Sequence, residues 1–210
     1  MTTLCELVKR PEESNGKIVR VRGSVELTME TYGLQDKSCS AYVHLTHSND
    51  TYMSKHEGEE FAFVPVVPDP ADPYRLIWDP KLSKPEKLSP GQAPPNLRWK
   101  AVEIPQPISL KKDDAYLNLT KSARERYTMK DGSVCRFCMM HDVSATVVGR
   151  FDFSDTQVIA FRTKTGGVKY EAAGFGHLNA PLRQIVVQSY SKVVVKPADS
   201  SVYEKKLALQ

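Results

Sequence analysis

The chain contains 210 residues, of which 40% are hydrophobic and 26% are charged, and it carries a formal net charge of +4. This composition is ordinary for a globular protein and excludes a disordered chain or a fibre. The slight basic excess does not by itself indicate a nucleic-acid-binding protein. No apolar run approaches the roughly 20 residues that a membrane-spanning helix needs.

The N-terminal segment predicts a short helix. In LCELVKRPEESNG, Leu4, Leu7 and Val8 recur at helical spacing, and Pro11 and the following Asn-Gly turn end the helix. The same segment lacks the basic and apolar regions of a signal peptide. The protein is therefore cytoplasmic if Met1 is the native start, and periplasmic or extracellular if Met1 replaces a removed leader.

The next segment, GKIVRVRGSVELTM (residues 16–29), predicts a half-buried strand. Its apolar and polar residues alternate strictly, with five apolar side chains on one face: Val19, Val21, Val25, Leu27 and Met29. Arg20 and Arg22 lie on the opposite face. Gly23 interrupts the apolar face, which permits a sharp bend or a bulge. A short strand over residues 40–47, SAYVHLTH, follows it and puts His44 and His47 on opposite faces, where they cannot chelate one ion together.

Residues 48–108 differ in composition from the rest of the chain. Eleven of the 14 prolines lie between Pro65 and Pro107. Because proline removes a backbone donor and fixes φ, we expect no regular central strand or long helix in this stretch. Its tryptophans and phenylalanines are too apolar to be left in water, so we interpret the stretch as an ordered insertion.

Three further strands and a helix are predicted in the second half. Residues 112–128 have an apolar stripe at helical spacing. Residues 142–153, DVSATVVGRFDF, alternate in the same way as the first strand and are again interrupted by a glycine, Gly149. Residues 158–163 and 183–195 predict two more strands. We expect the interior to include six residues of the two alternating strands: Val19, Val21, Val25, Ala145, Val147 and Phe151.

The segments GKIVRVRGSV, SATVVGRF and RQIVVQSYSKV resemble the first, fourth and fifth strands of an OB-type barrel. Residues 4–23 and 147–193, with VVGRFDF…GFGHLNAPLRQIVVQSYSKV in the second stretch, also resemble a group of uncharacterised bacterial OB-like proteins, many of them exported. This resemblance implies a fold and an extracytoplasmic location but no biochemical role. We therefore predict a mainly β chain forming a single domain over residues 1–210. It would be an OB-like antiparallel barrel with two short helices and a large, proline-rich irregular insertion, about 48–108, that wraps the barrel.

The four cysteines allow several interpretations. The spacing Cys135-x2-Cys138-x2-His141 is compatible with zinc, with a disulfide or with free thiols. If a strand begins early there, the two cysteines point to opposite faces and cannot share an ion, so we predict no metal site. Cys5 and Cys39 form a disulfide if the chain is exported and stay reduced if it is cytoplasmic.

No enzyme motif is present, so we predict a non-catalytic binding or protein-interaction module with no cofactor. Its partner would be a protein or a small ligand, with no membrane span. The candidate ligand-binding residues are Arg20, Arg22, Tyr42, Arg150 and His177. His177, in GFGHLNAP, binds a ligand or hydrogen-bonds within its own turn. The alternative function is binding of single-stranded nucleic acid through Arg20, Arg22, Arg150 and Tyr42.

Overall fold

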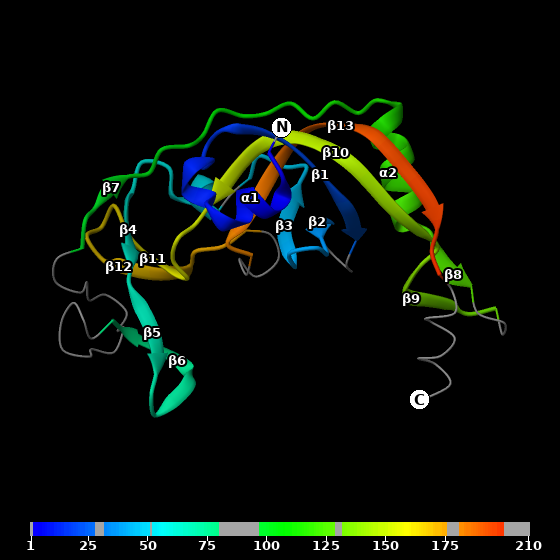
Figure 1. Ribbon diagram of the computed structural model, residues 1–210. Coiled ribbons are helices and arrows are strands. Elements are labelled where there is room, and N and C mark those ends of the chain that lie inside the picture. Colours follow the sequence, from blue (N-terminus) through cyan, green and yellow to red (C-terminus); the bar gives the residue numbers. More distant parts are fainter. Residues whose placement is uncertain are drawn as a thin grey trace. The chain divides into compact units, whose positions relative to one another are not determined.

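The computed structural model describes residues 2–27, 32–50, 52–79, 97–128, 132–175 and 181–199 (Figure 1). The prediction of a mainly β chain with two α-helices is confirmed for these residues. The chain divides into two compact units. Unit 1 contains Met1–Asn49, Pro107–Phe153 and Arg183–Gln210, and unit 2 contains Asp50–Gln106 and Ser154–Leu182.

Unit 1 contains five strands, and each of them pairs with two of the others. β1 pairs with β2 and with β10, β10 pairs with β13, β13 pairs with β3, and β3 pairs with β2. The long strands β10 and β13 lie side by side (Figure 1). The bounds are β1 Ile18–Leu27, β2 Tyr32–Asp36, β3 Ala41–Thr46, β10 His141–Phe153 and β13 Arg183–Pro197.

One of these five pairings differs from the antiparallel arrangement that we expected. β13 and β3 are parallel, with Gln184 opposite His44 and Val186 opposite Thr46. The two strands are far apart in the sequence, so no hairpin connection forces the chain to reverse between them. The other four pairings are antiparallel.

The interior of unit 1 matches the alternation in the sequence. All six residues that we placed there are buried: Val19, Val21, Val25, Ala145, Val147 and Phe151. The two interrupting glycines allow close backbone approach. A Cβ at Gly23 would lie 2.7 Å from the carbonyl oxygen of Gln35 on β2, and one at Gly149 would lie 2.2 Å from that of Val186 on β13. The β10–β13 register also shifts between Val148 and Gly149, an irregularity of the kind that a glycine within a strand permits.

Both helices of unit 1 begin at side-chain caps. α1 (Leu4–Lys9) begins with a capping box between Thr3 and Glu6, and it buries Leu4 and Leu7. The 3-10 turn η1 (Pro11–Glu13) follows it. α2 (Asp114–Arg124) begins at Asp113, whose carboxylate accepts a hydrogen bond from the backbone amide of Tyr116.

α2 is shorter than the predicted 112–128. Its C-cap residue, Glu125, is extended, and the next residues form β8 (Arg126–Thr128), which pairs with β9 (Val134–Met139). Arg126 donates a hydrogen bond to the carbonyl oxygen of Ala123, which satisfies one acceptor of the last helical turn.

Unit 2 combines the expected insertion with a segment about 100 residues later in the chain. Its four-stranded sheet has the order β12-β11-β4-β7. β4 and β7 come from the proline-rich stretch, and β11 and β12 follow β10. The remaining elements are the turn η2 and the hairpin β5–β6. The bounds are η2 Tyr52–His56, β4 Glu60–Val64, β5 Val66–Asp69, β6 Asp72–Trp78, β7 Lys100–Ala101, β11 Val158–Arg162 and β12 Val168–Ala172.

The expectation that residues 48–108 hold no central strand is wrong. β4 lies between β11 and β7 in the sheet. β4 itself contains no proline, and Pro65 follows its last residue, so the ladder keeps its donors. Residues 50–106 share a compact unit with residues 154–182.

The core of unit 2 lies on both faces of its sheet. On β11, Ile159 and Phe161 belong to one buried cluster, and Val158 and Ala160 belong to another. This explains why the sequence VIAF is continuously apolar rather than alternating. Neither α-helix in the described part of the chain is long and apolar enough to cross a membrane.

Candidate functional site

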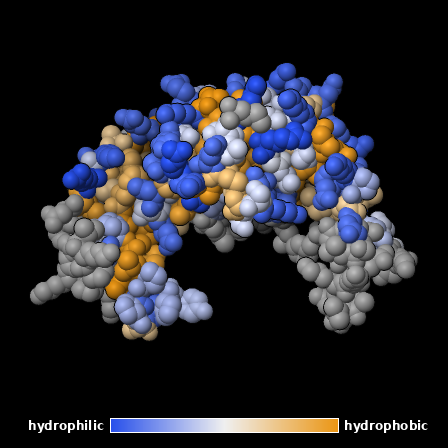
Figure 2. All heavy atoms as spheres, in the orientation of Figure 1, coloured by the Kyte–Doolittle hydropathy of each residue, from blue (hydrophilic) through white to orange (hydrophobic). Residues whose placement is uncertain are grey.

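A hollow of about 380 Å³ opens on unit 1 beside the outer side chains of β1, β10 and β13. Hydrophilic side chains predominate on the face of unit 1 that Figure 2 shows, with apolar patches between them. The residues that line the hollow come from β1, the turn after β2, the end of β9, and the strands β10 and β13: Ser24, Val25, Glu26, Lys37, Met139, His141, Asp142, Val143, Ser144, Val194 and Lys196.

The hollow contains charges of both signs. Glu26 and Asp142 supply carboxylates, and Lys37 and Lys196 supply ammonium groups. Glu26 accepts a 2.5 Å hydrogen bond from the side-chain amide of Gln35. Among the described residues, no carboxylate lies within ion-pair distance of Lys37 or Lys196. The hollow therefore offers both ammonium and carboxylate groups to a polar ligand.

Arg22, one of the expected ligand-binding residues, borders this hollow. Its Nη2 donates a 3.3 Å hydrogen bond to Oγ of Ser144, a lining residue. Its Nη1 donates a 3.1 Å hydrogen bond to the carbonyl oxygen of Lys192. Arg20 lies two residues earlier on the same face of β1 and is exposed. These two residues keep the surface position that the sequence predicted.

Arg150 does not have the exposed position that we expected. Its side chain is buried and forms a bidentate ion pair with Asp152, with 2.7 and 3.1 Å between the bonded atoms. Gln184, opposite Asp152 on β13, donates a further 2.9 Å hydrogen bond to that carboxylate. Residues 150 and 152 share a strand face and therefore meet each other. The guanidinium of Arg150 is therefore used within the fold.

Another expected site residue, Tyr42, lies on a different strand from Arg22. Tyr42 lies on β3, where its ring covers Gly33 of β2; a Cβ at Gly33 would lie 2.2 Å from Cε2 of Tyr42. His177 lies outside the described residues. Among the selected residues that the structure describes, Arg20 and Arg22 share one face of one strand.

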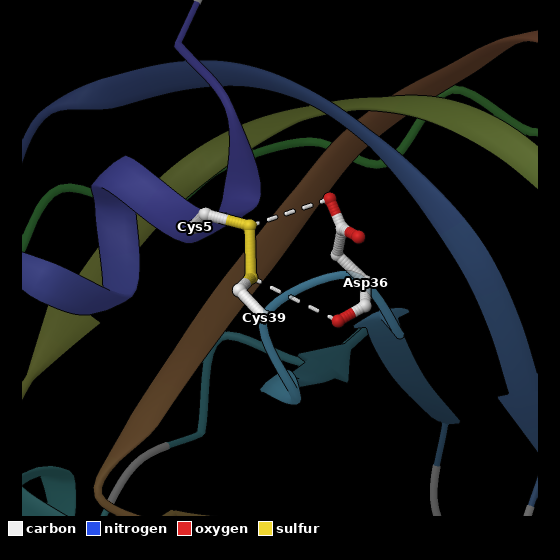
Figure 3. A group of neighbouring side chains, drawn as sticks. All are labelled: Cys5, Asp36 and Cys39. Carbon is white, nitrogen blue, oxygen red and sulfur yellow. Dashed lines mark hydrogen bonds between the residues drawn. A yellow bond between two sulfur atoms is a disulfide. The ribbon is translucent and has the colours of Figure 1, made fainter.

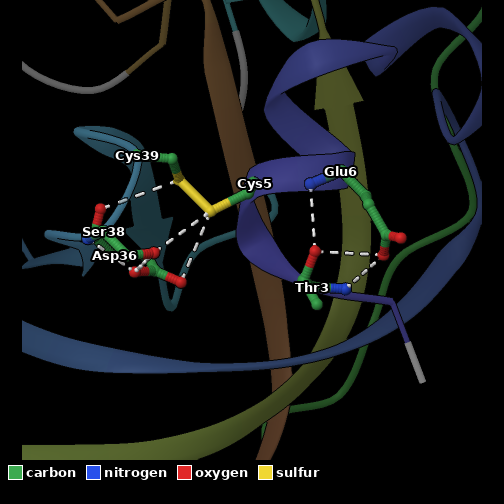
Figure 4. Close-up of a disulfide and its surroundings, with 6 residues drawn as sticks. All are labelled: Thr3, Cys5, Glu6, Asp36, Ser38 and Cys39. Atoms are coloured by element: carbon green, nitrogen blue, oxygen red, sulfur yellow. Dashed lines mark hydrogen bonds between the residues drawn. A yellow bond between two sulfur atoms is a disulfide. The ribbon is translucent and has the colours of Figure 1, made fainter.

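Cys5 and Cys39 form a disulfide between α1 and the turn that follows β2 (Figure 3). Their Cα atoms are 6.0 Å apart. Sγ of Cys5 lies 3.5 Å from Oδ2 of Asp36, and Ser38 donates hydrogen bonds from its amide and hydroxyl to Oδ1 (Figure 4). These bonds from Ser38 lower the pKa of Asp36. The ligand atoms of Cys5, Asp36 and Cys39 lie within 4.8 Å of one another, but the disulfide commits both sulfurs to each other.

Cys135 and Cys138 also form a disulfide, although both belong to β9. A strand does include both cysteines, and we expected their side chains to point to opposite faces in that case. The two sulfurs are bonded to each other instead. His141 does not join them, because its Nε2 lies 2.6 Å from Oε2 of Glu125. This segment therefore closes a disulfide, and its histidine pairs with a carboxylate.

The sequence did not identify a histidine–tyrosine cluster within unit 1. The ring of His47 contacts those of Tyr32, Tyr116 and Tyr190, with centroid distances of 5.0, 5.4 and 5.8 Å. Its Nε2 lies 2.7 Å from the hydroxyl of Tyr190. Burial, aided by the charge of Arg124, lowers the pKa of His47 to about 4. The tyrosines come from three different elements, so no local pattern could have shown this cluster.

A second histidine that the sequence left without a role lies in unit 2. His56 is buried and stacks on Phe161 with 3.5 Å between ring centroids. Its two ring nitrogens face Glu59 at 2.7 Å and Glu171 at 3.2 Å. Only Glu59 is near in the sequence, so the pairing depends on the sheet that brings β12 to η2.

No known protein family, curated protein or solved structure matches this chain.

Proposed function

We propose that unit 1 is a non-catalytic binding module with an OB-like barrel, and that the barrel takes a polar ligand in the hollow beside β1, β10 and β13. The order of the five strands supports the OB-like assignment. β1 pairs with both the second and the fourth strand, the third and fifth strands are parallel, and α2 comes between the third and fourth strands.

The observation that carries the proposal is the pair of lysines in the hollow. Lys37 and Lys196 line it without a carboxylate partner among the described residues, next to Glu26 and Asp142. An anionic group of a small molecule or of a partner protein would pair with the lysines. A cationic or hydrogen-bond-donating group would pair with the carboxylates. Such paired recognition gives orientation as well as attraction.

The location that we propose is outside the cytoplasm. The chain has two disulfides, and disulfides form and persist in an oxidising compartment but are rare in a reducing one. Fractionation of the native cells, followed by immunodetection in the periplasmic or extracellular fraction, tests this part of the proposal. Recovery of the protein only from the cytoplasmic fraction would contradict it.

The binding proposal is tested by NMR titration of the protein with hexa-aspartate peptide and with L-glutamate. We expect amide shifts concentrated at the lining residues of the hollow and at least tenfold weaker binding in Lys37→Ala/Lys196→Ala. Lys121→Ala, on α2 outside the hollow, is the matched control and should bind like the parent protein. Shifts spread over the whole surface, or equal losses in both variants, would refute the site.

A second candidate function is binding of single-stranded nucleic acid. Arg20 is exposed on β1, and the ring of Tyr42 lies across β2 and β3, the strands that OB-like barrels use for oligonucleotides. A labelled oligonucleotide should then bind with a steep salt dependence and lose affinity in Arg20→Ala/Arg22→Ala. A thermal melt of that variant is needed alongside, because Arg22 also bonds within the fold. Absence of binding at low salt eliminates this function.

A further inference from the structure

The two disulfides of this protein constrain the chain in different ways. Cys5 and Cys39 are separated by 34 positions and join α1 to the turn after β2. Cys135 and Cys138 are separated by three positions and lie in one strand. The entropy that a disulfide removes from the unfolded chain grows with the length of the closed loop, so the second bond contributes less to folding than the first.

The strand that contains Cys135 and Cys138 is held on both sides of the pair without help from the sulfurs. Val134 pairs with Thr128, and Met139 pairs with Arg126, both on β8. The backbone amide of Met140 also donates a hydrogen bond to the carbonyl oxygen of Glu125. The Cys135–Cys138 bond can therefore open while the β8–β9 ladder stays formed.

The two sulfurs differ in access. Cys138 is buried, with 5% of its surface exposed, whereas Cys135 is only partly buried and follows Val134, which is 63% exposed. An incoming thiolate must reach a sulfur to attack it, so Cys135 is the point of attack and Cys138 is the leaving thiolate. A two-residue spacing also keeps the leaving sulfur close enough to reverse the step.

We propose that Cys135–Cys138 is a site of reversible thiol–disulfide exchange with thiol or dithiol substrates, whereas Cys5–Cys39 is a structural bond. A substrate thiolate forms a bond to Sγ of Cys135, and the bond between the two cysteine sulfurs breaks, with its electron pair leaving on Cys138. A second substrate thiolate then attacks the substrate sulfur of this mixed disulfide and releases Cys135. In total, two substrate thiols are oxidised to a disulfide, and the protein takes up two electrons and two protons.

The test is a redox titration of the intact oxidised protein in glutathione buffers. Samples are quenched with acid, free thiols are alkylated with one isotopic reagent, and remaining disulfides are reduced and alkylated with a second. Peptide mass spectrometry then gives the reduced fraction of each pair. We expect an equilibrium constant for reduction by glutathione at least tenfold larger for Cys135–Cys138 than for Cys5–Cys39, with the circular dichroism spectrum unchanged.

Two single variants locate the attacked sulfur. Cys138→Ser leaves Cys135 alone, and oxidised glutathione should form a mixed disulfide with it at least tenfold faster than with Cys138 in Cys135→Ser. Earlier reduction of Cys5–Cys39, reduction of both pairs only on unfolding, or equal rates in the two variants would overturn the proposal. So would free thiols at Cys135 and Cys138 that oxidised glutathione does not convert to a disulfide.

Discussion

Arg22 donates a 3.1 Å hydrogen bond to the backbone carbonyl of Lys192, a non-glycine residue whose φ is +48°. The β10–β13 register shifts at this position, between the pairs Ser144/Val194 and Thr146/Ser191. A positive φ is unfavourable for a residue with a Cβ, so the bulge in β13 needs support from its neighbours. Arg22 on β1 supplies that support from across β10, and the bulge lies beside the proposed binding hollow.

We first predict that Arg22→Ala lowers the free energy of unfolding by about 1 to 3 kcal/mol, because two hydrogen bonds from a charged donor are lost. Lys192→Gly should not destabilise the protein and should raise the free energy of unfolding by up to about 1 kcal/mol, because glycine adopts a positive φ without strain. Urea denaturation of both variants measures these changes. Equal destabilisation by both would show that Lys192 is not strained.

The second prediction concerns the buried pair on β10. Asp152→Ala should lower the free energy of unfolding by about 3 to 5 kcal/mol, because Arg150 is then left buried without its counter-ion. The double variant Arg150→Met/Asp152→Leu should recover most of that loss, since it removes both charges. Thermal and urea denaturation distinguish the two variants. A double variant that is as unstable as Asp152→Ala would contradict this account.

The third prediction is a pH dependence that arises from His47. Burial favours its neutral form and lowers its pKa to about 4, below the value of roughly 6.5 in an unfolded chain. Between these two values the unfolded state binds more protons than the folded state, so stability rises with pH in this window. The contribution of His47 is complete above pH 6.5 and is lost as the pH falls towards 4, by about 1 to 2 kcal/mol because solvent screens the partly exposed ring.

NMR titration of the imidazole protons of His47 tests this value directly. Urea denaturation between pH 4 and 7 should show the corresponding slope, and His47→Gln should reduce it. Glu125→Gln serves as the control variant, because it alters the carboxylate partner of His141, which lies outside the His47 cluster. The slope due to His47 should remain in this variant. A midpoint near 6.5 for His47 would contradict the effect of burial.

A fourth prediction separates the two disulfides by stability. Replacing Cys5 and Cys39 together by serine should lower the free energy of unfolding by about 4 kcal/mol, because their bond closes a long loop. Replacing Cys135 and Cys138 together should cost only about 2 kcal/mol by the same reasoning. Denaturation of the two double variants under non-reducing conditions compares them. A larger loss for the second pair would require a structural role for that bond.

The alternation of residues in β1 and β10 was sufficient to predict these two strands and their buried faces. Side chains in a strand point alternately to opposite faces, so the positions of Val21 and Val147 in the core and of Arg20 at the surface follow from sequence spacing alone. Thr3 and Asp113 likewise have the residue types that cap helices. These features depend on neighbours within a few residues.

Only the tertiary structure decided which distant segments meet. β4 became a central strand because β11, about 100 residues later, pairs with it. Arg150 lost its expected exposure because Asp152 pairs with its guanidinium, and Gln184 of β13 donates a hydrogen bond to the same carboxylate. His56 gained a second carboxylate from Glu171 only when unit 2 formed. Periodicity predicts the face of a strand on which a side chain lies, but it does not predict which residue from a distant segment will contact that side chain. Those contacts determine which polar residues pair within the fold and which remain available to a ligand.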